Sequence, residues 1–166
     1  GYAPKLRAAQ ALAWEHYASD GQLTLERASR VVADLLTKGL QLTAAADLVA
    51  SLIADGVLRV RGQTFVDFMN PAIQELCVAR YLLDLPPAER RHFLLTHDAD
   101  IAAMYGGVAA DGSDVLGLLL DDFERFDRAL EAREVAHESI NPYVSTLWHA
   151  AHLAQNGRIE PELMSR

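Results

Sequence analysis

The stretch from Gly56 to Leu83 constrains the fold most, because two strand-like runs are followed there directly by a helix-like run. The first run, residues 57–61, alternates apolar side chains with arginine. The second, residues 65–68, is rich in β-branched and aromatic side chains. Gly62 and Gln63 favour a tight turn between the two runs. The pattern therefore predicts a two-stranded β-hairpin.

A helix is expected to begin directly after this hairpin. Asn70 and Pro71 interrupt the strand pattern, because proline has no N–H for a sheet ladder. Proline suits the first helical position, and asparagine before it suits a side-chain cap. Apolar residues at spacings near three and four then predict a face buried in the core, formed by Ile73, Leu76, Cys77, Tyr81 and Leu83.

Three helices are predicted before the hairpin. The first spans residues 4–18, and the second and third follow the capping residues Thr24 and Thr43. Gly39 and Gly56 are expected to close the second and third helices in the left-handed conformation. Three helices, a hairpin and a helix follow the order of a winged-helix domain, the alternative being another small α+β bundle.

The second half of the chain predicts helices alone, so the fold class is mainly α. Leu85 and the tandem prolines after it mark an expected boundary between a winged-helix-like domain, residues 1–85, and an acidic helical subdomain, residues 86–166. Within the subdomain, helices are expected to start at Pro87, after a Ser113 cap and at Pro142, with a turn-rich interval bracketed by Gly106-Gly107 and Asp111-Gly112.

Charge is distributed unevenly along the chain, whose net charge is −8. Residues 1–83 carry eight Lys/Arg and eight Asp/Glu, whereas residues 84–166 carry seven and fifteen. An acidic second half repels phosphate backbones and anionic lipids, so contact with nucleic acid or a membrane is not expected there. Cys77, the single cysteine, excludes an intrachain disulfide and suits the cytoplasm.

No run of about 20 apolar residues is present, and none of the phosphate-binding, dinucleotide-binding or nucleophile-elbow motifs occurs. We therefore predict no catalytic residue and no membrane contact for this segment. The chain begins at Gly1 without a methionine, so we expect it to be part of a longer protein.

Three groups of residues are of types that also occur in metal or catalytic sites, but we do not favour such a site for any of them. His149 and His152, with His137 and Glu138 upstream, lack a strong metal-ligand spacing, so no metal site is predicted. The carboxylate pairs at Asp121-Asp122 and Asp98-Asp100 lie among polar residues and are expected to be a solvated surface. Cys77 has apolar neighbours and is expected to be an inert core thiol.

DNA binding is the obvious alternative for a winged helix. The helix that would enter the major groove, residues 43–55, contains no Lys, Arg, Asn or Gln and has two acidic residues. Only Arg59 and Arg61 of the wing, with Lys38 nearby, remain to touch a DNA backbone. We therefore treat a DNA-binding transcription regulator as an alternative and not as the main interpretation.

The sequence VLRVRGQTFVDFMNPAIQELCVARYLL, residues 57–83, resembles the winged-helix region of the signal-transduction NTPases with numerous domains. This STAND class includes NACHT and NB-ARC proteins. Its pattern F-x-H-x-x-x-Q-E-Y-x-x-A-x-Y-L is matched here at Phe68, Gln74, Glu75, Ala79, Tyr81 and Leu82. Residues 52–58 similarly resemble the family's L-V-x-D-G-L-L entry to the wing. The resemblance covers residues 40–85 well and residues 1–40 in outline.

One departure from the family pattern concerns nucleotide binding. Members often carry a histidine after the wing that approaches the terminal phosphate of ADP, and Asn70 stands at that position. Phe68 to Pro71 also resembles a Phe-x-Asn-Pro variant of some bacterial members. Asn70 is expected to be a helix cap, and its amide can also donate a hydrogen bond to phosphate but brings no positive charge.

The resemblance implies a regulatory segment of an ATP-driven switch, with the winged helix packed on a nucleotide-binding domain of the same chain. That domain, and not this segment, would bind ATP or ADP. Some members act in bacterial defence or in transcriptional control. The remaining alternative is a stand-alone helical adaptor whose apolar faces bind a protein partner or a second copy of the chain.

Overall fold

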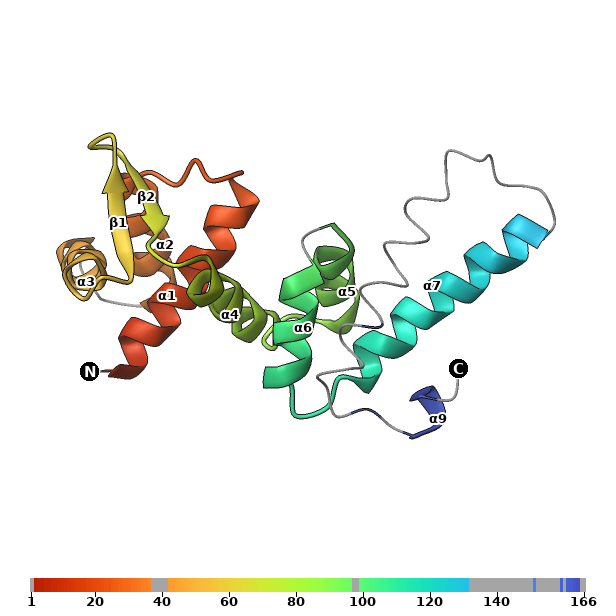
Figure 1. Ribbon diagram of the computed structural model, residues 1–166. Coiled ribbons are helices and arrows are strands. Elements are labelled where there is room, and N and C mark those ends of the chain that lie inside the picture. Colours follow the sequence, from red (N-terminus) through yellow and green to blue (C-terminus); the bar gives the residue numbers. More distant parts are fainter. Residues whose placement is uncertain are drawn as a thin grey trace. The chain divides into compact units, whose positions relative to one another are not determined.

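A computed structural model describes residues 2–36, 42–96, 99–131, 151, 159 and 161–164 (Figure 1). The described residues are mainly helical, with one small two-stranded antiparallel sheet, which confirms the predicted mainly α class. The chain divides into two compact units, Gly1–Tyr81 and Leu82–Arg166. None of the described helices is long and apolar enough to cross a bilayer.

The first unit contains three helices, the hairpin and a fourth helix, in the order that the sequence predicts. Figure 1 shows the hairpin rising beside the first three helices. The elements are α1 (Tyr2–Ala18), α2 (Leu25–Leu36), α3 (Leu42–Ala54), β1 (Leu58–Arg61), β2 (Phe65–Phe68) and α4 (Pro71–Leu82).

The helix ends follow the predicted signals in part. Thr24 caps α2, since its Oγ1 accepts a hydrogen bond from the Arg27 N–H at 3.1 Å. Gly56 closes α3 with a φ of 73°, which a residue with a Cβ adopts only at a cost. The predicted Thr43 cap is wrong by position, because α3 begins at Leu42. Gly39 lies outside the described residues.

The hairpin forms as predicted. Arg61 pairs with Phe65 at its tip, and the register continues from there to Leu58 opposite Phe68. Gly62 and Gln63 both have positive φ, 58° and 67°, as tight hairpin turns require. Residues alternate between two faces, so Val66 is buried on one face while the arginines of β1 lie on the other.

A third extended segment pairs with the hairpin. Thr24, between α1 and α2, forms an isolated antiparallel bridge with Phe65. The Val66 N–H donates to the Leu23 carbonyl at 2.7 Å, and the Leu25 N–H donates to the Thr64 carbonyl at 2.9 Å. Since Leu23 and Val66 are fully buried, these bonds fasten the hairpin over the helical core.

The buried face of α4 differs from the one that the sequence predicts. Asn70 caps the helix as expected, because its Oδ1 accepts a hydrogen bond from the Ala72 N–H at 2.9 Å. Ile73 and Leu76 were expected in the core, yet each is 40% exposed. The buried side chains are Cys77, Val78, Ala79 and Leu82. Helical periodicity identified an apolar face, and the packing buries a neighbouring face more completely.

The regular elements described in the second unit are all helices. Its helices are α5 (Pro87–Thr96), α6 (Ala99–Val108), α7 (Ser113–Glu131) and α9 (Pro161–Met164). The predicted start at Pro87 is confirmed. The interval predicted between Gly106-Gly107 and Asp111-Gly112 is non-helical from Ala109 to Gly112, but both of the first glycines lie inside α6. Ser113 is the first residue of α7 and not its cap, because the Leu116 N–H already donates to the Gly112 carbonyl.

Arg90 connects three parts of this second unit. Its Nε donates to the Leu85 carbonyl at 2.5 Å, and its Nη1 donates to the Tyr105 hydroxyl at 2.9 Å and to Asp114 at 3.2 Å. Around it lies an apolar core that is nearly closed to solvent, formed by Phe93, Leu94, Ile101, Tyr105, Val115, Leu116 and Leu119. The helix predicted from Pro142 lies outside the described residues, apart from Ala151, which is helical.

The tethering of the hairpin predicts the effect of one substitution. Leu23→Ala removes a fully buried side chain between hairpin and helices and should lower the free energy of unfolding of the first unit by about 2–5 kcal/mol. Urea unfolding followed through amide signals of residues 2–81 measures this. Val60→Ala, at a site 42% exposed on the same sheet, is the control and should cost under about 1 kcal/mol. If both variants lost the same free energy of unfolding, the prediction that Leu23 contributes more to stability than Val60 would be wrong.

Candidate functional site

Asn70 lies at the exposed start of α4, where its side-chain oxygen is used in the cap. The Gln74 N–H donates to the Asn70 carbonyl at 3.2 Å, which completes the first turn. A helix N-terminus carries a partial positive charge. The cap is therefore confirmed, while the contact of Asn70 with a nucleotide stays a prediction.

The two arginines of the wing share one carboxylate. Arg59 lies opposite Asp67 in the register, with its Nε 3.9 Å from Oδ2. The Nε of Arg61 donates to the same oxygen at 2.8 Å, and its Nη2 donates to the Gly21 carbonyl at 3.2 Å. The Arg61 guanidinium also lies 5.2 Å from the centre of the Phe65 ring. Arg61 is thus engaged within the unit. Lys38 lies outside the described residues.

The face of α3 that would meet DNA carries no cation. Between residues 44 and 54, the exposed side chains of α3 are Ala46, Asp47, Ala50 and Ala54. Such a face offers no group for a phosphate and no donor for the edge of a base.

The residues considered for a metal site, His137, Glu138, His149 and His152, lie outside the described residues. Within the described ranges, no group of three His, Cys, Asp or Glu side chains is placed to hold a metal ion.

The carboxylate pairs are not uniformly solvated. Asp121 is exposed as expected. Asp122, however, is only 18% exposed and forms ion pairs with Arg91 and Arg125, so it belongs to the packing of α7 and α5. Asp100 is exposed, and Asp98 lies outside the described residues.

Cys77 is a buried thiol, as the sequence predicts. Burial raises the pKa of Cys77 to about 11, and the nearby charge of Arg80 opposes this shift. The thiol form therefore dominates at neutral pH, which is the opposite of an activated nucleophile.

A polar network that the sequence analysis missed joins α1, the wing and α4. His16, in the last turn of α1, lies with Nε2 3.4 Å from Asp67 Oδ1 and with Nδ1 2.9 Å from Gln74 Nε2. Its ring also lies nearly perpendicular to that of Phe68, with 6.4 Å between the ring centres and 88° between the ring planes. The side chains of His16 and Asp67 are only 16% and 14% exposed, so water competes little for these bonds.

Asp67 is the charged centre of this network. Partial burial acts to raise its pKa, but the hydrogen bonds and charges of Arg61 and His16 outweigh burial and hold the pKa of Asp67 below its ordinary value. The carboxylate is therefore the stable form in the folded unit.

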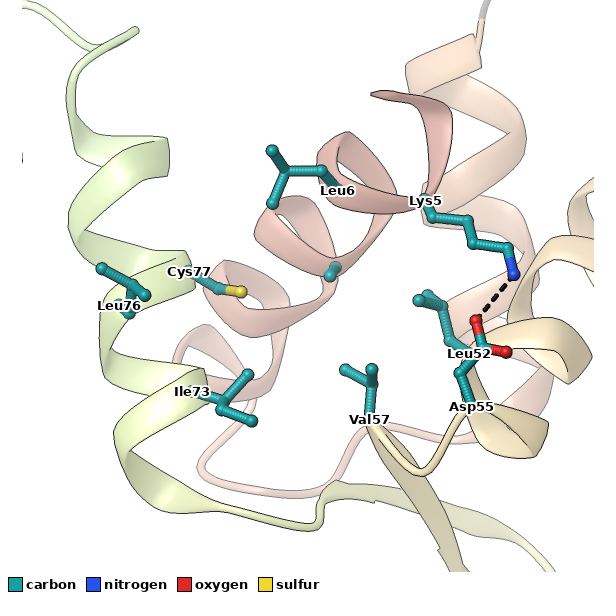
Figure 2. A pocket seen from close by; sticks show the side chains of 9 residues that line it. Lys5, Leu6, Leu52, Asp55, Val57, Ile73, Leu76 and Cys77 are labelled. Atoms are coloured by element: carbon teal, nitrogen blue, oxygen red, sulfur yellow. Dashed lines mark hydrogen bonds and ion pairs between the residues drawn. The ribbon is translucent and has the colours of Figure 1, made fainter. Parts of the chain in front are cut away.

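A pocket of about 260 Å³ lies between α1, the end of α3 and α4, and none of the network residues lines it. Leu6 of α1, Ile73 and Cys77 of α4 and Val57 before β1 point toward the same space (Figure 2). The Nζ of Lys5 donates to Asp55 Oδ2 at 2.6 Å on its rim. The walls are apolar, and the two rim charges neutralise each other.

Part of the polar network could be predicted from the sequence. An alternating strand with arginines, paired to a strand with one aspartate, predicts a cross-strand ion pair once the register is fixed. His16 had no such signal, because it reaches Asp67 and Gln74 from 51 and 58 residues away.

Comparisons of the chain with models of protein families, with curated proteins and with solved structures found no match.

The lowered pKa of Asp67 predicts how stability depends on pH. Since its folded-state pKa lies below the unfolded value near 3.8, ionised Asp67 stabilises the fold above that value. The contribution is lost as pH falls through the folded-state pKa. Asp67→Asn should therefore lower the free energy of unfolding at neutral pH by about 1–3 kcal/mol, and the difference from wild type should shrink in acid.

Urea unfolding across that pH range measures the difference. Asp47→Asn, on the exposed face of α3, is the control and should change stability by less than about 0.5 kcal/mol. A loss for Asp67→Asn that stays constant from neutral to acid pH would contradict the role of the ionised carboxylate.

The raised pKa of Cys77 predicts slow alkylation. A rise from 9.0 to about 11 reduces the thiolate population, and thus the rate with iodoacetamide at neutral pH, by about 100-fold. The reference is the same chain unfolded in urea. Comparable rates in the folded and unfolded chains would show that the thiol is neither buried nor suppressed.

Proposed function

We propose that this chain is a non-catalytic regulatory segment of a larger nucleotide-dependent switch of the STAND class. Residues 1–85 would form its winged helix, and residues 86–166 an acidic helical subdomain. ATP or ADP would be bound by an adjacent nucleotide-binding domain of the same protein, in the cytoplasm, with no cofactor in this segment. The resemblance in residues 57–83 supports this proposal.

The arrangement of the first unit also supports a winged helix. Its three helices are followed by a two-stranded wing, and Thr24, between α1 and α2, forms an isolated bridge with Phe65 of that wing. In a winged helix the hairpin flanks the third helix, and α3 here leads through Gly56 directly into β1.

The exposed face of α3 is the single observation that carries the regulatory interpretation. Between residues 44 and 54 this surface consists of alanine side chains and Asp47, so it carries no positive charge for a phosphate and no donor for a base. The same face would be repelled by a phosphate backbone. A winged helix with this surface favours a protein neighbour over DNA.

The contacts of the two wing arginines also favour a protein neighbour over DNA. Arg61 is held by Asp67, Gly21 and Phe65, so its contact with DNA would require breaking those interactions. Arg59 remains more exposed, but one residue gives little affinity for a duplex. A DNA-binding regulator is thus the weaker alternative.

A helical adaptor is the second candidate, and one observation favours it. Four large apolar side chains of the first unit are at least two-fifths exposed: Val60, Met69, Ile73 and Leu76. Ile73 and Leu76 line the pocket, and exposed apolar side chains beside a pocket are typical of surfaces that bind protein. In this version the chain would bind a protein partner or another copy of itself without nucleotide control.

The test uses substitutions of Asn70 in the full-length protein. The gene of that protein should also encode a phosphate-binding loop upstream of Gly1. Asn70→Ala should speed the release of bound ADP about tenfold, because it removes an amide that donates to phosphate. Asn70→Asp should speed release at least as much, because a carboxylate repels phosphate. Both rates are measured with a fluorescent ADP analogue.

Asn70→Asp is the informative control, since its oxygen can still cap α4 as the asparagine does. If Asn70 is only a cap, this variant should release ADP like wild type while Asn70→Ala loses stability. That result, or a full-length gene without a phosphate-binding loop, would overturn the proposal.

A further inference from the structure

The pocket between α1, the end of α3 and α4 lies entirely within the first unit, because its nine lining residues fall between Lys5 and Cys77. Segments far apart in the sequence form this one concavity. Leu6 of α1, Val57 before β1 and Ile73 of α4 point into it (Figure 2). A concave and mainly apolar space formed by several elements is the usual form of a small-molecule site.

The pocket has a packed inner part and an exposed side. Ala9, Leu52 and Cys77 line it and are only 5%, 2% and 6% exposed. Ile73 and Leu76 line it from α4, and each is 40% exposed. These two are among the four large apolar side chains that are exposed in the described part of the chain. A molecule in the pocket would therefore gain free energy by covering them.

The charges of the pocket are already neutralised. Of the nine lining residues only Lys5 and Asp55 are charged, and the Nζ of Lys5 donates to Asp55 Oδ2 at 2.6 Å. Cys77 contributes a neutral thiol, because burial raises its pKa to about 11. A charged ligand would lose hydration among these walls and would find each rim charge already paired. The lining therefore favours an uncharged molecule.

The volume of the pocket, about 260 Å³, limits the size of its occupant. An apolar cavity of about 150 Å³ is enough to hold benzene. One or two rings therefore fit here. The pocket cannot enclose a helix of a partner protein, whose diameter with side chains is about 10–12 Å. Such a partner could insert one side chain at most.

We propose that the pocket between α1, the end of α3 and α4 is a binding site for an uncharged, mainly apolar small molecule of one or two rings. The ligand packs against the buried side chains of Ala9, Leu52 and Cys77, and Ile73 and Leu76 lose exposed surface when it binds. This binding site does not depend on the proposed switch function.

The test is a titration of the full 166-residue chain with indole, an uncharged two-ring probe, followed by methyl NMR. Indole should bind with a dissociation constant of about 0.1–1 mM, as expected for a ligand of its size. One saturable process should shift the methyl signals of the pocket, those of Leu6, Leu52, Val57, Ile73 and Leu76.

The methyl groups of Val60 and Met69 are the internal controls of this titration, because both side chains are exposed and neither lines the pocket. Their signals should stay in place. Equal shifts at these two residues would show that indole adsorbs to any exposed apolar side chain. That result, or the absence of a saturable shift in the pocket, would overturn the proposal.

A pair of matched variants locates the binding. Leu76→Trp places a larger side chain at the pocket and should weaken indole binding at least about tenfold by filling the space. Since Leu76 is 40% exposed, the fold can accept this change, which the NMR spectrum checks. Val60→Trp, at a site 42% exposed outside the lining, should bind indole as wild type does. Equal affinities in the two variants would contradict the site.

Cys77 gives a second readout in the wild-type chain, because its thiol lines the pocket. At an indole concentration ten times the dissociation constant, alkylation by iodoacetamide should slow about tenfold, in proportion to the unoccupied fraction. An unchanged rate at that concentration would overturn the proposal without any substitution.

Three outcomes would assign the pocket to another occupant and overturn the proposal. Tighter binding of indole-3-acetate or tryptamine than of indole would mean that the ligand is charged. Binding of a tryptophan-containing helical peptide, with no binding of free indole, would mean that the occupant is a protein. Pocket signals that shift with the concentration of the chain alone would mean that a second copy covers the pocket.

Discussion

The first unit depends on the pairing between the hairpin and the short segment that precedes α2. Two backbone bonds, from Val66 to Leu23 and from Leu25 to Thr64, fasten β2 to that segment. Leu23 and Val66 beneath them are inaccessible to water, so the bonds are shielded and the side chains fill the core. A two-stranded hairpin is marginal by itself. Its order here comes from this attachment, which also fixes where Asp67 and Asn70 lie.

The opposite face of the same hairpin carries the charges. Alternation along β2 places Val66 and Phe68 in the core and Asp67 on the other side, beside His16 and the two arginines. The strand β2 therefore supplies both the apolar side chains that pack in the core and the carboxylate that accepts the hydrogen bonds of the network. A shift of register by one residue would exchange the faces, burying Asp67 and exposing its apolar neighbours. The pairing at Leu23 prevents that shift.

Local patterns in the sequence predicted the elements better than their packing. The hairpin, the Thr24 and Asn70 caps and the Gly56 closure follow from rules on neighbouring residues, and each is found. The buried face of α4 did not follow, because Ile73 and Cys77 are both apolar in a pattern and only the tertiary packing decides which is covered. His16 and Gln74, likewise, meet through tertiary structure alone.

The two halves of α4 are attached to the first unit by different kinds of contact. Apolar burial is spread over many contacts, so no single event releases the half of α4 that contains Val78 and Leu82. A hydrogen bond is directional and is lost when one donor or acceptor is lost. The N-terminal half of α4 is attached differently, because Ile73 and Leu76 stay 40% exposed while Gln74 Nε2 lies 2.9 Å from His16 Nδ1. The end of α4 that carries Asn70 therefore depends more on polar contacts than the end that carries Val78.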